Sequence, residues 1–310
     1  MKRDTSFMVT NTFRRKFVDF ASRIGVYVVA GLTIILLAFV IIFIFKEAFS
    51  LFTKGYVSEN ANFRNLLSLS WQPINVEPRY GIIPLIMGSL KVALIALVIA
   101  LPLGVLSALY VSVYASRRVK EVVKPVIELI AGLPTVVIGF FMLIVAASFL
   151  QSVLQWDFRL NAVVGGMGVS LVIIPVVFTI SEDGMNAVPR SIIESAYAMG
   201  ASKHHIAWKI VLPSSLNAVF SAGIVGGMRA FGETMIVLMA TGNAPIPLWD
   251  PLLPVRTMSA TIASEMGEVH IGSEHYVVLF IIGFILLVVT LIFNTIANVV
   301  ASLLRRKLYS

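Results

Sequence analysis

Long runs without Asp, Glu, Lys or Arg constrain this chain more than any other feature of its sequence. An α-helix rises about 1.5 Å per residue, so about 20 apolar residues cross the hydrocarbon core of a bilayer. The composition agrees, since 58% of the residues are hydrophobic and only 13% are charged. We predict an all-α membrane protein with spans at 24–45, 92–116, 129–156, 160–181 and 276–304.

A sixth apolar run, 211–241, differs because it contains Arg229 and Glu233. We predict that it forms one helix, which gives six transmembrane helices. A charge at the centre of a span costs about 2.5–3.5 kcal/mol on insertion scales, and such residues usually face a bundle interior or an aqueous cavity. Arg229 and Glu233 are therefore candidate functional residues.

The distribution of Lys and Arg predicts the orientation. With a cytoplasmic amino terminus, the inner segments hold 16 of the 24 basic residues and the outer segments hold six. The positive-inside rule then places both termini in the cytoplasm and explains the net charge of +8 without a nucleic-acid partner. The expected order is a cytoplasmic segment (1–23), an anchor helix (24–45), an extracytoplasmic loop (46–81) and the remaining spans (82–310).

The residues needed for most enzymatic chemistry are missing. The chain has no cysteine, which excludes disulfides, thiolate catalysis and iron–sulfur clusters, and no glycine-rich loop ends in Gly-Lys-Ser or Gly-Lys-Thr to hold a nucleotide. His204 and His205 are adjacent and do not form a metal-binding pattern. Glu182 and Asp183 are expected in a solvated loop. We therefore predict no catalytic, cofactor or metal site in this chain.

The inner loop 182–210 is long and partly apolar. Gly200 is expected to end a first helix over 191–199, and Ser202 can cap a second one. The first helix carries apolar residues at helical spacing, namely Ile192, Ile193, Ala196 and Met199. Either a soluble second subunit or the protein's own helix ends could bury this stripe.

Part of this loop resembles the EAA signature of ABC importer permeases. The matching residues are Glu194, Ser195, Ala196, Gly200, Ile210, Leu212 and Pro213, with Ser195 in place of the usual alanine. The resemblance implies a type I ABC importer permease fold, MetI-like, in which 194–200 forms a coupling helix. That helix would sit in a groove of a separate subunit, which binds ATP and Mg²⁺.

Further segments are similar to the PstC-type permease of the phosphate-specific transporter. They lie at 80–84, 131–141, 181–183, 187–189, 229–234, 255–257 and 260–263, so the resemblance begins near Tyr80 and makes 82–310 a permease domain. It implies a bacterial or archaeal cytoplasmic membrane and inorganic phosphate as cargo. It also implies a homologous second permease, two ATP-binding subunits and an extracytoplasmic phosphate-binding protein as partners.

Arg229 and Glu233 would share a face of one helix, because they are four residues apart. A guanidinium presents a planar fork of donors that suits tetrahedral oxyanions. We expect the pair to relay phosphate, although a purely structural pair between helices is the alternative.

Three other residues have structural expectations. Lys91 is expected to extend outward to water, and Gly223 with Gly227 to pack helices closely rather than to form a hinge. Pro134 either kinks a span or ends a short preceding helix.

Two alternatives for function remain open from the sequence. A permease for sulfate, molybdate or phosphonate would keep the mechanism and change the cargo. An ion-coupled anion carrier would use Arg229 and Glu233 without any ATPase.

Overall fold

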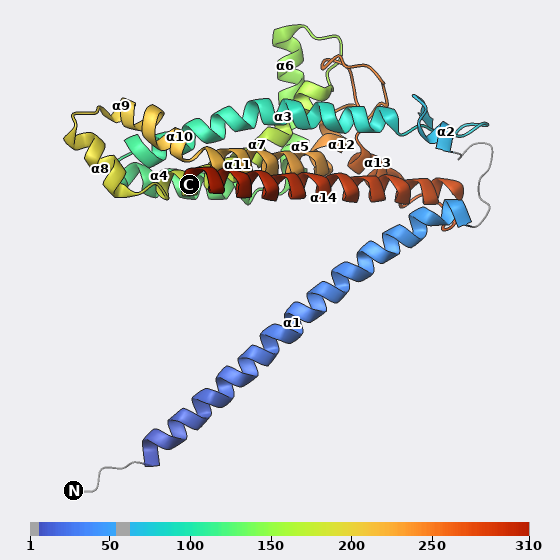
Figure 1. Cartoon of the computed structure of the whole chain (residues 1–310). Coiled ribbons are helices and arrows are strands. Elements are labelled where there is room, and N and C mark those ends of the chain that lie inside the picture. Colours follow the sequence, from blue (N-terminus) through green and yellow to red (C-terminus); the bar gives the residue numbers. More distant parts are fainter. Residues whose placement is uncertain (1–5, 54–62, 310) are drawn as a thin grey trace, which may run out of the picture.

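The computed structural model describes residues 6–53 and 63–309. Residues 1–5 of the predicted N-terminal segment and 54–62 of the predicted outer loop lie outside the described residues. Most of the described chain forms a helical bundle, with α8 (Arg190–Ala198) and α9 (Lys203–Ile206) at one end and α2 (Phe63–Leu66) at the other (Figure 1).

Among the described residues, five helical segments are long and apolar enough to cross a membrane: Val18–Ser50, Ile83–Tyr114, Thr135–Leu154, Ala162–Asn186 and Glu274–Ile296. They belong to α1 (Ser6–Thr53), α3 (Ile83–Leu109) with the π-helical turn η1 (Tyr110–Tyr114), α5 (Thr135–Phe141) with η2 (Met142–Ala146) and α6 (Ala147–Leu154), α7 (Ala162–Asn186) and α14 (Glu274–Tyr309). A bent pair, Lys203–Ser214 and Leu216–Gly232, passes the same test together. The predicted all-α membrane fold with six spans is confirmed, the sixth being this bent pair.

The core lies where α3, α7 and α11 (Leu216–Gly232) meet. Lipid provides no hydrophobic force between helices, so small residues that allow close backbone approach stabilise such contacts. A Cβ on Gly104 of α3 would lie 2.7 Å from Val177 Cγ1 of α7. On α11, a Cβ on Gly223 or Gly227 would lie within 3.4 Å of a leucine methyl of α3, which confirms their packing role.

The predicted span at 129–156 begins too early. The amphipathic helix α4 (Arg117–Ala131) extends through its first residues, and the span is built from α5 (Thr135–Phe141), η2 (Met142–Ala146) and α6 (Ala147–Leu154). Pro134 immediately precedes α5, with φ −59° and ψ 130°. Of the two roles considered for Pro134, the structure shows the separation of two helices, because the extended backbone there cannot continue α4.

The prediction of one helix over 211–241 is wrong. The chain bends by 64° between the segments that end at Ser214 and begin at Leu216. A second break follows Gly232, where Glu233 has ψ 136°, before α12 (Met235–Ala240) begins. Ser259 Oγ donates to the backbone oxygen of Glu233 at 2.6 Å, so a side chain satisfies a carbonyl at the break.

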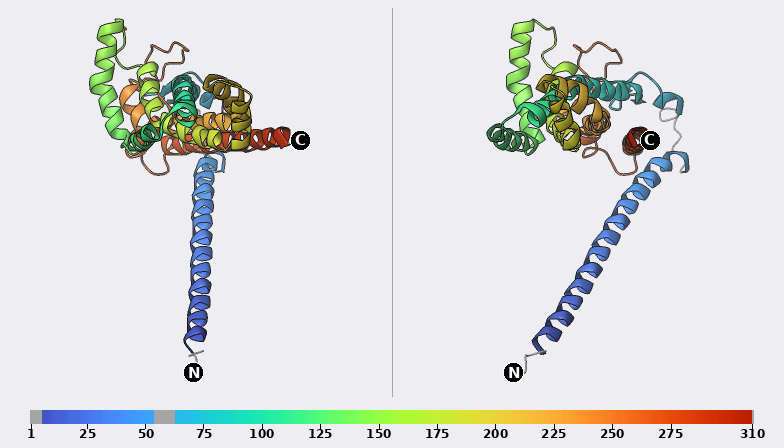
Figure 2. Two further views of the ribbon diagram at one scale, coloured as in Figure 1. Left: turned by 90° about the vertical axis from the view of Figure 1, so that its left-hand side faces the viewer. Right: turned by 60° about the vertical axis from the view of Figure 1, so that its left-hand side comes forward.

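The end of the bundle opposite α8 and α9, which the predicted orientation makes the outer end, contains more structure than a loop. Strands β1 (Trp71–Gln72) and β2 (Arg79–Tyr80) pair antiparallel, with Trp71 opposite Tyr80. The segment before α14 forms α13 (Met258–Glu265), whose Met258 and Ala260 are fully buried within the protein. By contrast, α1 contacts α14 through its own carboxyl-terminal part, and the rest of α1 projects away from the bundle (Figure 2).

Candidate functional site: a coupling hairpin and a membrane-embedded arginine

Helices α8 and α9, joined by a short turn, form a helical hairpin with the geometry that the sequence predicts. We call it the inner hairpin, because the predicted orientation places it on the inner side. Helix α8 ends at Ala198, and Gly200 adopts φ +83°, a left-handed conformation that favours glycine. Ser202 Oγ then accepts a hydrogen bond from the backbone nitrogen of His205 at 3.2 Å and caps α9. The predicted helix-turn-helix is confirmed.

The apolar stripe of α8 divides into two faces. Ile193 and Ala196 pack against the core of this chain, whereas Ile192 is 48% and Met199 is 88% exposed. Glu194 and Ser195 are also exposed, and a Cβ at Gly200 would meet no atom within 4 Å. The protein's own helices therefore cover the face of α8 that carries Ile193 and Ala196, and the opposite face with Glu194 and Ser195 stays exposed.

The remaining motif residues connect the hairpin to the membrane helices. Ile210 lies in the π-helical turn η3 (Ala207–Val211), and Leu212 and Pro213 lie in α10 (Leu212–Ser214). Ile210 and Leu212 pack against the core, while Pro213 is exposed. The 64° bend follows directly, so movement of the hairpin would act on α11 through this short connection.

Arg229 and Glu233 do not form the predicted pair. Helix α11 ends at Gly232, so Glu233 lies on extended backbone and does not share a helical face with Arg229. Within the described chain, neither side chain has an ion pair. Arg229 is exposed and Glu233 is half-buried. The structure therefore shows no Arg229–Glu233 ion pair that locks two helices together among the described residues.

Two charged residues are buried contrary to expectation. Lys91 is 3% exposed, and its Nζ donates to the backbone oxygens of Leu248 and Asp250, the latter at 3.0 Å, instead of reaching water. Glu182 is not in a solvated loop, because α7 continues to Asn186. Its carboxylate lies 2.9 Å from Lys124 Nζ and ties α7 to α4.

A buried polar cluster at the outer end was missed by the sequence reasoning. The Glu265 carboxylate lies 2.5 Å from Arg256 Nη2 and 2.8 Å from His275 Nε2, and it accepts from Trp71 Nε1 at 3.3 Å. These residues join the β-hairpin, α13 and the start of α14. Only Arg256 lies in one of the family-like segments, and Trp71 and Glu265 are 194 residues apart, so no local spacing in the sequence predicts the cluster.

Tyr80 packs on this cluster, with its ring centroid 5.9 Å from that of His275. Burial, followed by the negative charges of Glu274 and Glu265, raises the pKa of Tyr80 to about 12. The phenol therefore stays neutral well above the usual titration range of tyrosine.

The structure thus has an exposed helical hairpin at one end and an arginine in an apolar helix. The profile of the family described as binding-protein-dependent transport system inner membrane component matches residues 100–308. This chain belongs to that family.

Curated relatives narrow the relationship within this permease family. The chain is 31% identical to the phosphate transport system permease protein PstC of Xylella fastidiosa over 272 residues, covering 80% of this chain and 82% of the relative. It is 34% identical to the probable ABC transporter permease protein YqgH of Bacillus subtilis over 222 residues, 72% of each chain. The chain is thus a permease of the PstC type.

Solved permease structures share the fold. A bacterial ABC transporter involved in the import of alginate gives a TM-score of 0.63 at 14% identity, covering 95% of this chain and 98% of that chain. The MetNI methionine ABC transporter gives 0.51 at 18% identity, covering 71% and 94%. At such identities the likeness concerns the fold alone.

Proposed function

We propose that this permease forms half of the translocation pathway of an ATP-driven importer of inorganic phosphate. Residues 82–310 are its permease domain, 1–23 a cytoplasmic segment, 24–45 an anchor and 46–81 an extracytoplasmic loop. Its partners are a homologous second permease, two ATP-binding subunits and an extracytoplasmic phosphate-binding protein. ATP and Mg²⁺ bind to the partner ATPases, and this chain performs no catalysis.

The observation that carries the proposal is the exposed face of α8. Ile192 and Met199 expose apolar surface beside Glu194, on a hairpin whose inner face is already packed against the bundle. Exposed apolar surface of this kind indicates a protein partner. An ATP-binding subunit docked there would drive the membrane helices through η3 and α10.

Arg229 supports an anionic cargo. An arginine in an apolar span usually faces protein or an aqueous cavity, and this one has no acidic partner among the described residues. A second permease on this side would enclose the guanidinium in a pathway between the two subunits. In that pathway the guanidinium attracts phosphate, and Glu233, which directly follows α11, is the second pathway residue of this proposal. Phosphate as the cargo follows the names of the PstC relatives.

The hairpin end faces the cytoplasm in this proposal, with both termini on the same side of a bacterial or archaeal cytoplasmic membrane. ATP closes the two ATPases, moves the coupling helices and opens the pathway outward to accept phosphate from the binding protein. Hydrolysis reverses the change. The cycle is a population shift between two arrangements, driven by the differential binding of nucleotide.

Co-purification tests the docking surface. Glu194→Lys and Gly200→Trp place a reversed charge and a bulky ring on the open face, so both should release the ATP-binding subunit while the chain still inserts. Glu268→Lys is the matched control, because it reverses an exposed carboxylate at the outer end. ATPase retained by both variants at wild-type stoichiometry would contradict the proposed coupling.

A further inference from the structure

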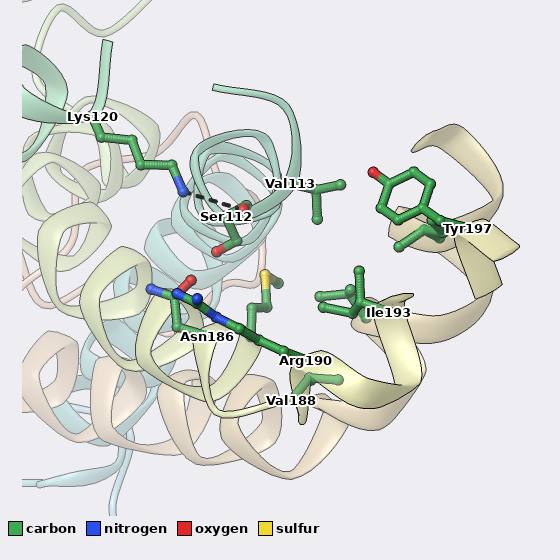
Figure 3. A pocket seen from close by; sticks show the side chains of 11 residues that line it. Ser112, Val113, Lys120, Asn186, Val188, Arg190, Ile193 and Tyr197 are labelled. Atoms are coloured by element: carbon green, nitrogen blue, oxygen red, sulfur yellow. Dashed lines mark hydrogen bonds between the residues drawn. The ribbon is translucent and has the colours of Figure 1, made fainter. Parts of the chain in front are cut away.

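A cavity of about 390 Å³ lies behind the coupling helix, on the face of α8 that does not carry the open motif residues (Figure 3). Arg190, Ile193 and Tyr197 of α8 line one side. Ser112 of η1 and Lys120 of α4 line another. Its volume is within the range of small-molecule sites in proteins.

The wall of the cavity carries positive charge without an acidic residue. Lys120 and Arg190 both line it, and neither belongs to an ion pair among the described residues. Lys120 Nζ donates to the backbone oxygen of Ser112 at 3.3 Å, which leaves other ammonium hydrogens free (Figure 3). The nearby carboxylate of Glu182 is matched by Lys124 at 2.9 Å. The net charge facing the cavity is therefore positive.

Ser112 lines the cavity, and its hydroxyl oxygen is closed to solvent and makes no hydrogen bond among the described residues. A buried hydroxyl without a partner is unfavourable. Ser112 lies in the π-helical turn η1, and Val211 of the π-helical turn η3 also lines the cavity. Turns of this type are frequently found at functional sites.

We propose that this cavity is a binding site for a phosphate group from the cytoplasmic side. The Arg190 guanidinium supplies a planar fork of donors and Lys120 supplies a point charge, and rotation of the Ser112 side chain adds its unpaired hydroxyl as a third donor. Inorganic phosphate and small phosphate monoesters share this chemistry. The site is separate from Arg229, which lies in the last turn of α11.

A ligand here would join the coupling helix to the bundle, because Arg190 belongs to α8 whereas Lys120 and Ser112 belong to α4 and η1. It therefore stabilises the present arrangement of the hairpin and opposes the movement that drives transport. If the cargo is phosphate, which rests on the proposed function, accumulated cytoplasmic phosphate slows its own import.

Equilibrium binding of radiolabelled inorganic phosphate tests the site in the purified complete transporter, without ATP and without the extracytoplasmic binding protein. Lys120→Gln and Arg190→Gln should each weaken binding by about tenfold or more, since each removes a charged hydrogen-bond donor. Lys203→Gln is the matched control, because Lys203 is an exposed cation on α9 that does not line the cavity. Arg229→Gln should remove only binding in the translocation pathway and keep the binding component that Lys120→Gln and Arg190→Gln weaken.

Three results would overturn the site: no saturable binding to the wild type at millimolar phosphate, unchanged affinity in both cavity variants, or loss of binding in Arg229→Gln alone. Competition with glycerol 3-phosphate and sulfate identifies the ligand. Stronger displacement by the monoester supports the site but refutes feedback by the cargo. The binding assay needs no transport, so failure of the phosphate-import proposal would be seen separately, in uptake.

Discussion

Replacing Glu265 by glutamine should leave the Arg256 guanidinium inside the protein without its ion-pair partner. The Glu265 and Arg256 side chains are only 10% and 15% exposed, and Arg256 Nε already lacks a hydrogen-bond partner among the described residues. Removing one member of a buried ion pair costs about 3–5 kcal/mol. Because the amide oxygen can still accept a hydrogen bond, we expect the lower end, about 3 kcal/mol. Because 1 kcal/mol shifts the melting temperature by about 2–4 °C in chains of 150–250 residues and by less in larger ones, that corresponds to a melting temperature about 6 °C lower.

Thermal denaturation in detergent, followed by fluorescence-detected size-exclusion chromatography, measures this loss. Glu268→Gln makes the same chemical change at an exposed carboxylate three residues away, and it should melt within about a degree of the wild type. Adding Arg256→Met to Glu265→Gln should recover part of the loss, because no unpaired charge remains buried. Equal melting of the Glu265 and Glu268 variants would refute the reasoning that the buried carboxylate holds this cluster together.

Three further predictions concern packing, pH and cargo. Gly104→Val should destabilise the protein by about 1–3 kcal/mol, because its Cβ would approach Val177 Cγ1 to 2.7 Å, whereas Gly31→Val, with no atom within 4 Å, should not change the melting temperature. The folded-state pKa of Tyr80, about 12, lies above its ordinary value of 10.0, so stability is unaffected below pH 10 and falls as the pH rises towards 12. Denaturation against pH should show this loss in the wild type and a smaller one in Tyr80→Phe. Arg229→Gln should abolish phosphate uptake while the complex still assembles, and unchanged uptake at matched expression would make Arg229 a structural residue.

The parts of the fold set by local sequence could be predicted. Apolar length identified the spans because lipid imposes it on any crossing helix. Gly200 and Ser202 identified the hairpin because each satisfies a specific backbone requirement, a positive φ and a helix cap.

The predictions that were wrong, and the cluster that was missed, share one physical cause: each feature depends on contacts between residues far apart in the sequence. The length of an apolar run could not reveal the helix break at Glu233. There, Ser259 from a distant segment donates a hydrogen bond to the Glu233 backbone oxygen. Lys91 is buried because two loop carbonyls, 157 and 159 residues away, replace water around its ammonium group. The Glu265 cluster likewise assembles from three separated segments, so no spacing rule could predict it.

ATP-dependent uptake of radiolabelled phosphate tests the central claim most directly. The assay uses proteoliposomes that contain this permease with its partner permease, the ATP-binding subunits and the binding protein, with unlabelled phosphate, sulfate and molybdate as competitors. We predict uptake that requires ATP and that only unlabelled phosphate inhibits. Phosphate uptake without nucleotide would contradict ATP coupling, and uptake of another oxyanion in place of phosphate would contradict the assigned cargo.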